Sequence, residues 1–340
     1  DNANTTNSWF NLGKILELTL NNGYSTVTGK KICDLPSGNS DALTLLKTVR
    51  ERFYKNAEFF CDEMIKSANG ASRAISHLPV PFLSTVMGGI ETGYDVRDIK
   101  NQGTKYNGSG CLIHGTSVVA DSFTAIDKLL AERPQDAERL LNALKNNFEG
   151  DEELREFLLS APKFGNNNEI ADNEAVEITN RIADMVRNKK NYLGNNFRPD
   201  FSTPSTHLLY GYWVGALPCG RKSRDMLNYG VDPLYGEAQN GLGFRTLSLM
   251  KLPFIKMCGG YASHFGIDPK YFTTYSYESK GIEFKNKVMK PLFFNELNKN
   301  VAPFYLYVNV TTAEILRKVL AEPKKYAPSG VYIMRIHGTF

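Results

Sequence analysis

No stretch of the 340-residue sequence approaches the roughly 18 consecutive apolar residues that a membrane-spanning helix needs, so a transmembrane protein is excluded. Charge of one sign is not in excess either. Lys plus Arg total 40, Asp plus Glu total 36, and the net charge of +4 is too small to predict nucleic acid or a membrane surface as a partner. Apolar residues make up 42% of the chain, which allows a sizeable core.

Cysteine is scarce and scattered, with five residues and no CxxC or CxH pair. This pattern argues against a disulfide scaffold and a structural zinc site, and it favours a reducing, cytoplasmic setting. The five histidines share no helical metal-ligand spacing, so we expect no metal site. No two carboxylates can be singled out by spacing as an acid/base pair.

Residues 105–115 are glycine-rich and lead into an expected helix. One interpretation is a phosphate cradle at the helix N-terminus. We favour a tight strand-to-helix turn, because no Gly-Lys-Ser/Thr follows at Walker spacing. Cys111 and His114 lie close enough in sequence for a Cys–His pair, but we expect Cys111 to be a structural thiol.

Hydrophobic periodicity predicts helices and strands that alternate along the chain, which favours an α/β fold. The expected helices are residues 9–21, 40–70, 83–91, 116–130, 134–148, 152–159, 173–186 and 312–320. The expected strands are residues 26–36 (a short strand and turn), 208–214, 246–249, 304–310 and 331–336. The loop 219–243 is too long for an idle connection, so we expect it to carry function.

Six sequence blocks, in order, resemble the C-terminal half of glycyl radical enzymes related to pyruvate formate-lyase. The blocks are residues 10–23, Tyr106-Asn107 with Asp121-Ser122 and Ile126, residues 144–150, residues 161–167, residues 211–233 with Gly220-Arg221-Lys222, and residues 323–338 with Arg335 and Gly338. Each block alone is weak, but their order along essentially the whole chain is specific. The chain is therefore identified as a member of this family.

The resemblance implies a ten-stranded α/β barrel built from two five-stranded halves, of which this chain is the second. Residues 1–325 would form the C-terminal half of the barrel domain, and residues 326–340 the start of the glycyl radical loop. The family's cysteine loop would precede Asp1. We therefore expect the chain to be ordered only with the missing N-terminal half, as a separate chain or another segment, and to form a homo-oligomer.

The resemblance also implies a mechanism in which Gly338 carries the radical. A separate activating enzyme, which uses S-adenosylmethionine and an iron–sulfur cluster, would remove a hydrogen from its α-carbon. A cysteine upstream of this chain would then pass the radical to a small organic substrate as a thiyl. Glycine suits the role because it allows close backbone approach and has no side chain. The following residues, Thr339 and Phe340, depart from the family pattern.

The resemblance leaves the reaction open between cleavage and formation of C–C or C–heteroatom bonds. Diol dehydratases of the family carry an aspartate that would fall near residues 5–7, where no acid stands. This favours an arylacetate decarboxylase or a fumarate-adding synthase over a diol dehydratase. A non-catalytic or partner-subunit homologue is the competing class. We select His207 and the Gly220-Arg221 turn as substrate-binding candidates.

Overall fold

The computed structural model describes most of the chain. The described residues are 6–98, 109–203, 206–267, 269–290 and 305–310, with the single residues 314, 317, 318, 321, 322 and 325. The predicted strand 331–336 and Gly338 lie outside them, as does most of the predicted helix 312–320.

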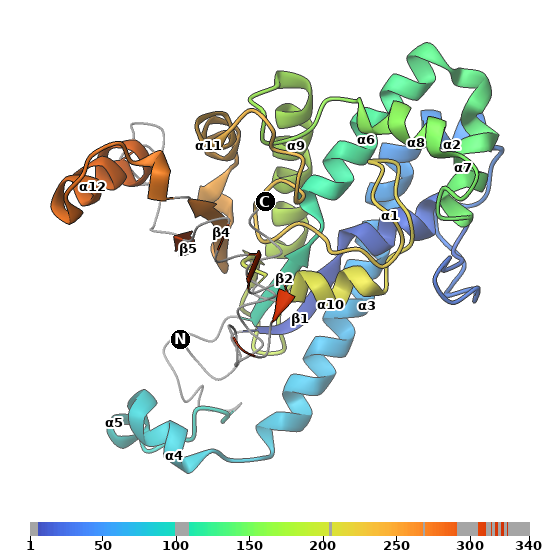
Figure 1. The fold of residues 1–340 in the computed structure, drawn as a ribbon. Helices are drawn as coiled ribbons and strands as arrows, with labels where there is room; N and C mark the ends of the chain where they lie inside the picture. Colours follow the sequence, from blue (N-terminus) through green and yellow to red (C-terminus); the bar gives the residue numbers. More distant parts are fainter. Residues whose placement is uncertain are drawn as a thin grey trace.

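Five parallel strands form one sheet in the order β1-β2-β3-β4-β5, which is also their order along the chain (Figure 1). The strands are β1 Thr6–Asn11, β2 Ser109–His114, β3 Phe197–Phe201, β4 Gly260–Ile267 and β5 Tyr305–Val310. Parallel strands that advance in one direction place right-handed crossovers on one face of the sheet, as in the wall of a barrel. The sheet is thus the five-stranded barrel half that the family resemblance implies.

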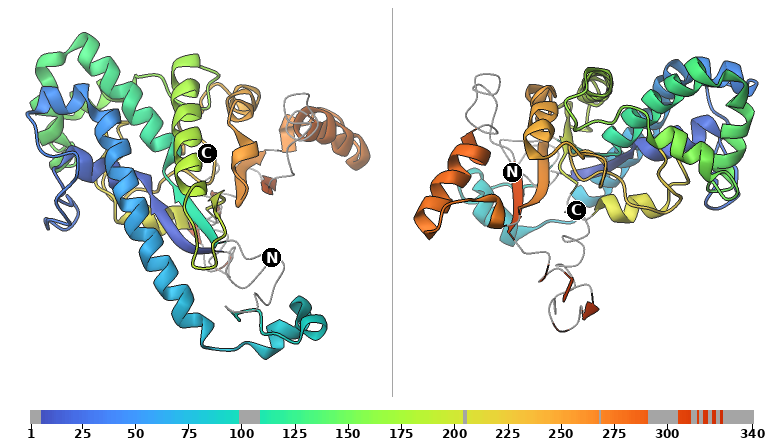
Figure 2. Two further views of the ribbon diagram at one scale, coloured as in Figure 1. Left: turned by 180° about the vertical axis from the view of Figure 1, so that it is seen from behind. Right: turned by 45° about the horizontal axis from the view of Figure 1, so that its top comes forward.

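Helices supply the crossovers and cover the sheet. They are α1 Leu12–Leu20, α2 Ala42–Lys47, α3 Val49–Ser76, α4 Pro81–Ser84, α5 Ile90–Thr92, α6 Thr116–Glu132, α7 Ala137–Lys145, α8 Glu152–Leu159, α9 Glu169–Arg187, α10 Thr206–Tyr212, α11 Leu242–Met250 and α12 Tyr277–Phe284. Helix α3 packs on β1 and α9 on β3, while α6 lies against α9. The view from behind in Figure 2 shows these three long helices on one face of the sheet.

The expected strand-to-helix turn within residues 105–115 is present, but it is limited to Gly115, because residues Ser109–His114 before it form the strand β2. All six of its residues are buried, because the strand lies between β1 and β3. Strands buried on both faces lose the polar–apolar alternation that identifies a strand in a sequence. The strands β3 and β4 were not predicted, since Pro199 interrupts one and glycines begin the other.

The helix predicted over residues 9–21 was placed to start too early, because residues 9–11 are the last residues of β1. Trp9 and Phe10 pair with β2, and α1 starts only at Leu12. The Asn11 side chain marks the boundary by accepting a hydrogen bond from the Lys14 amide at 3.0 Å, which caps the helix.

Two predicted strands are helices. Residues 208–214 fall mainly in α10, and residues 246–249 fall in α11. In α10 the buried residues His207 and Gly211 are four apart, so burial follows helical spacing although the run is rich in aromatic residues. Residues 26–36 form turns with a single bridge between Tyr24 and Lys31 rather than a strand.

Other predicted elements are confirmed with small boundary shifts. Residues 116–130 correspond to α6, residues 152–159 to α8, and residues 304–310 to β5. The predicted helix 134–148 contains α7, and the predicted helix 173–186 lies within α9. Residues 40–70 become α2 and α3, which break at Thr48, and residues 83–91 become α4, a π-helical turn and α5.

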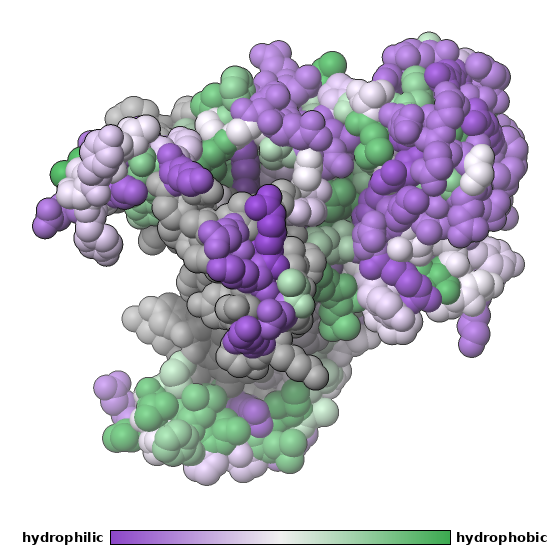
Figure 3. Space-filling view, viewed as in Figure 1, coloured by the Kyte–Doolittle hydropathy of each residue, from purple (hydrophilic) through white to green (hydrophobic). Residues whose placement is uncertain are grey.

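The core lies between the sheet and its helices. Large side chains that are fully buried include Phe53 of α3, Phe123 of α6 and Phe197 of β3. In contrast, the surface over α4 and α5 is apolar (Figure 3), with Phe82 84% and Ile90 78% exposed. Within the described residues, no helix combines the length and the apolar composition that crossing a bilayer requires.

Candidate active site

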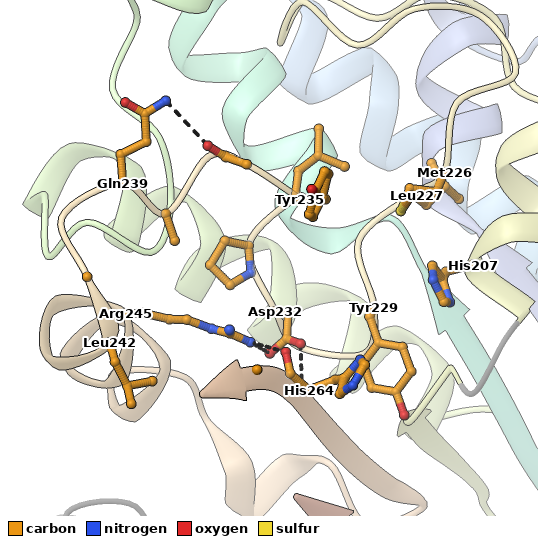
Figure 4. Close-up of a pocket in the computed structure, with 16 residues that line it drawn as sticks. His207, Met226, Leu227, Tyr229, Asp232, Tyr235, Gln239, Leu242, Arg245 and His264 are labelled. Atoms are coloured by element: carbon orange, nitrogen blue, oxygen red, sulfur yellow. Dashed lines mark hydrogen bonds and ion pairs between the residues drawn. The ribbon is translucent and has the colours of Figure 1, made fainter. Parts of the chain in front are cut away.

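A cavity of about 440 Å3 lies at the carboxyl end of the sheet, beside the second half of β4. Ligands of parallel α/β sheets bind at this end, because the loops that follow the strands converge there. Helix α10, which follows β3, contributes His207, and the long loop 219–243 contributes most of the other lining residues. The lining residues are His207, Met226, Leu227, Tyr229, Asp232, Pro233, Leu234, Tyr235, Gly236, Ala238, Gln239, Gly241, Leu242, Arg245, His264 and Gly266 (Figure 4).

The segment 229–241, which we name the strap, begins along the edge of β4 and lines the cavity. Strand β3 pairs with β4 at only two positions, Asp200–Gly260 and Phe201–Tyr261. Beyond these two positions the strap replaces β3 as the hydrogen-bonding neighbour of β4, since the Val231 amide donates to the Ala262 carbonyl at 3.0 Å. Gly230 makes this approach possible: its φ is +49°, and a Cβ there would lie 2.0 Å from the Ala262 oxygen.

The Asp232 carboxylate anchors the strap to β4 and α11. It accepts hydrogen bonds from the His264 amide at 2.7 Å and from the Ser263 hydroxyl. It also pairs with the Arg245 guanidinium at 2.6 Å. Burial raises the pKa of Asp232, and the adjacent Arg245 opposes that shift. The two charges in this wall of the cavity therefore neutralise each other.

Two imidazoles flank Tyr229 on the polar wall. The Tyr229 ring centroid is 5.2 Å from that of His207 and 5.3 Å from that of His264, and Figure 4 shows the three rings on one side of the cavity. Burial lowers the pKa of His207, so the ring is neutral at pH 7. Its Nδ1 lies 3.3 Å from the Thr203 carbonyl, which can only accept, and this leaves Nε2 as the unprotonated nitrogen.

His114 supports α10 from the end of β2. Its Nε2 is 2.8 Å from the Thr206 hydroxyl, and its ring lies 4.5 Å from that of Tyr210. Burial lowers the pKa of His114 to about 4, so it is also neutral at physiological pH. His114 does not line the cavity, but it fixes the helix that carries His207.

The structure brings His207 to the cavity and leaves Gly220 and Arg221 outside it. Arg221 is buried, and its guanidinium donates to the backbone carbonyls of Gly211 at 2.8 Å, Gly215 at 2.7 Å and Met226 at 3.1 Å. Gly220 has a φ of +90° and packs against Leu159. The Arg221 side chain thus ties together the segment that leads into the strap, and a substrate contact for either residue stays a prediction.

Cys111 and His114 do not form a pair. They are three residues apart in β2, so their side chains point to opposite faces of the sheet. The Cys111 sulfur lies 3.7 Å from that of Met64, and burial raises the pKa of the thiol. A phosphate cradle cannot be traced fully, because residues 105–108 lie outside the described residues; Gly110 is in the strand itself.

The sequence did not single out Tyr229, Asp232, Arg245 and His264 as site residues. Gly230-Val231 and Pro233 belong to a block of the family resemblance, and that block was the available signal for the strap. Among the described residues, no cluster of three or more His, Cys, Asp or Glu is placed to hold a metal ion.

The sequence and the fold match those of a known family. The family model "Pyruvate formate lyase-like" matches residues 1–211. A trans-4-hydroxy-L-proline dehydratase from Clostridioides difficile is 27% identical over 322 residues, which are 94% of this chain and 39% of that protein.

Solved structures agree with this match. The B12-independent glycerol dehydratase from Clostridium butyricum is similar with a TM-score of 0.82 and 24% identity, over 99% of this chain and 44% of that one. A glycyl radical enzyme from Archaeoglobus fulgidus is similar with a TM-score of 0.80 and 25% identity, over 95% and 40%. The chain belongs to the pyruvate formate lyase-like family of glycyl radical enzymes, and it spans about 40% of the length of these relatives.

Proposed function

We propose that the chain is the part of a glycyl radical dehydratase that carries the radical glycine, Gly338, and one wall of the substrate cavity. The observation that carries this proposal is the likeness to the hydroxyproline dehydratase over 94% of the chain. The sequence favoured an arylacetate decarboxylase or a fumarate-adding synthase, but the relatives reported above do not support that preference. A count of residues upstream of α1 was a weak basis for it, since a single gap moves the aspartate position.

Dehydration of a small hydroxylated substrate suits the cavity. A thiyl radical from the enzyme's cysteine would take a hydrogen atom from the substrate carbon, water would leave from the neighbouring carbon, and the thiol would return the hydrogen atom. The reaction is redox-neutral overall. Tyr229 and the neutral His207 offer hydrogen-bond partners for hydroxyl groups. Leu227, Leu234 and Leu242 line the same space and help to separate the reacting groups from bulk solvent and from other hydrogen-atom donors that would quench a radical.

The partners follow from the same proposal. A separate activating enzyme that uses S-adenosylmethionine and an iron–sulfur cluster would generate the radical at Gly338. The cysteine loop and the other five strands of the barrel would come from a segment or chain outside this sequence. We further propose a cytoplasmic location, because a glycyl radical requires an oxygen-poor, reducing compartment. We also propose that the protein forms a homo-oligomer.

Electron paramagnetic resonance of the anaerobically activated, full-length protein tests the proposal. We expect a glycyl doublet in the wild type and none in Gly338→Ala. Gly281→Ala is the matched control, since Gly281 lies in α12 with open space around its Cα, and it should keep the doublet. The activated enzyme should convert trans-4-hydroxy-L-proline or glycerol with loss of water. A wild type without a doublet under full activation would instead support a non-catalytic homologue.

A further inference from the structure

The block 161–167 matches the family but lies outside the cavity, and the structure indicates a role for it. Asn166 uses all four hydrogen-bonding positions of its side-chain amide on backbone groups. Its nitrogen donates to the carbonyls of Glu237 at 2.7 Å and Lys163 at 3.3 Å. Its oxygen accepts from the amides of Gln239 at 2.9 Å and Asn240 at 3.1 Å. Three of these four partners belong to the strap.

The loop that presents Asn166 is held firmly by the core. The Phe164 amide donates to the buried Asp121 carboxylate at 2.8 Å, and the Thr124 hydroxyl donates to the Pro162 carbonyl at 2.8 Å. The Lys163 ammonium donates to the Cys219 carbonyl at 2.8 Å. A loop fixed by several such contacts is a rigid support for a neighbouring segment.

Pro233 of the strap packs directly on this loop. Gly165 has a φ of +96°, and a Cβ built there would lie 2.2 Å from the Pro233 ring. The glycine therefore provides both the left-handed backbone conformation and the space for the strap to approach.

The strap thus has two anchors. Asp232 holds its first part to β4 and α11, and Asn166 holds its last part, around Glu237 and Gln239. Residues between and beside the anchors line the cavity, among them Tyr235 and Ala238. A Cβ built at Gly236, between the two anchors, would meet no atom within 4 Å, so the backbone at this position borders open space.

We propose that Asn166 is a positioning residue that sets substrate affinity by holding the strap in place as a wall of the cavity. The proposal rests on the proposed function, because it takes this cavity to be the substrate site. Asn166 itself does not line the cavity, so its effect passes through the backbone of residues 237–240. It acts on the shape of the site and not on the radical chemistry.

The test compares wild type, Asn166→Ala and Asn166→Asp in the activated, full-length enzyme. We expect Asn166→Ala to raise KM about tenfold and to change kcat less than about twofold, because the strap loses the hydrogen bonds that fix its position. Asn166→Asp keeps an acceptor for Gln239 and Asn240 but loses the donor to Glu237, so its KM should be intermediate. Amide hydrogen exchange at Gln239 and Asn240 should be faster in Asn166→Ala.

Asn168→Ala separates strap positioning from general stability. Asn168 is two residues away and caps α9 by accepting from the amides of Ile170 and Ala171. Its loss should lower the unfolding midpoint and leave KM unchanged. An active wild type with an unchanged KM in Asn166→Ala, or equal KM changes in both alanine variants, would overturn the inference alone. A wild type with no turnover would overturn the proposed function and the inference with it.

Discussion

The ion pair between Asp232 and Arg245 permits a quantitative prediction. Their side chains are only 5% and 14% exposed, and the charged atoms are 2.6 Å apart. Removing one partner of a buried pair leaves the other charge desolvated and uncompensated, which typically costs about 3–5 kcal/mol. Because Arg245 retains some exposure, we take the lower end, and we expect Asp232→Asn to destabilise the protein by about 3 kcal/mol.

Asp232→Ala should cost more. It also removes the acceptor for the His264 amide and the Ser263 hydroxyl, which adds about 1 kcal/mol for each hydrogen bond. The expected total is about 5 kcal/mol. Arg245→Met alone should cost about 3 kcal/mol, since it leaves a buried carboxylate.

The double variant Asp232→Asn/Arg245→Met carries neither charge and should lie much closer to the wild type than the sum of the single variants. The coupling free energy from this cycle should be about 3 kcal/mol. Urea unfolding of all four proteins, followed by circular dichroism at fixed pH and salt, measures it. A coupling below about 0.5 kcal/mol would refute the reasoning, because independent sites are additive within that range.

Three further predictions concern the surroundings of the site and the core. Gly230→Ala should cost at least about 2 kcal/mol, since it combines a positive φ with a 2.0 Å approach to the Ala262 oxygen. Gly236→Ala, where φ is also positive but the space is open, should cost about 1 kcal/mol in the same urea assay. Burial raises the pKa of Asp121 to about 7, from about 4 in the unfolded chain, so the folded state binds more protons between these values. Wild-type stability should therefore fall relative to Asp121→Asn as the pH rises from 5 to 8; equal pH profiles would contradict this. Iodoacetamide should label the exposed Cys258 in the native protein, and the buried Cys111 and Cys219 only after unfolding, as peptide mass spectrometry can check.

Local sequence predicted the amphipathic helices well, because their buried apolar residues recur at helical spacing within a short segment. α8 matches its predicted bounds, and α6 begins at the predicted residue. The buried strand β2 was missed, since Ser109, Gly110 and His114 look like turn residues until strands cover both edges. The runs in α10 and α11 looked like strands, because aromatic and β-branched residues favour strands when no tertiary contact opposes them.

The site residues, too, were predicted only in part from the sequence. His207 was selected from the sequence as a substrate-binding candidate and lies in the cavity wall. Arg221 was selected in the same way, but its guanidinium donates to backbone carbonyls of its own chain. A short motif does not reveal whether a guanidinium faces a ligand or its own chain. Asp232, Arg245 and His264 are separated by up to 32 residues and meet only because the strap pairs with β4.

The sequence by itself determined the family, the α/β class and most helices, because ordered motifs and helical periodicity depend only on nearby residues. Only the tertiary structure decided that all five described strands are parallel and adjacent in chain order, and that a polar wall forms where β3 ends and β4 continues. The physical reason is that strand pairing, buried charge compensation and cavity shape arise from groups far apart in the chain. Those groups acquire partners only when the fold brings them within hydrogen-bonding distance.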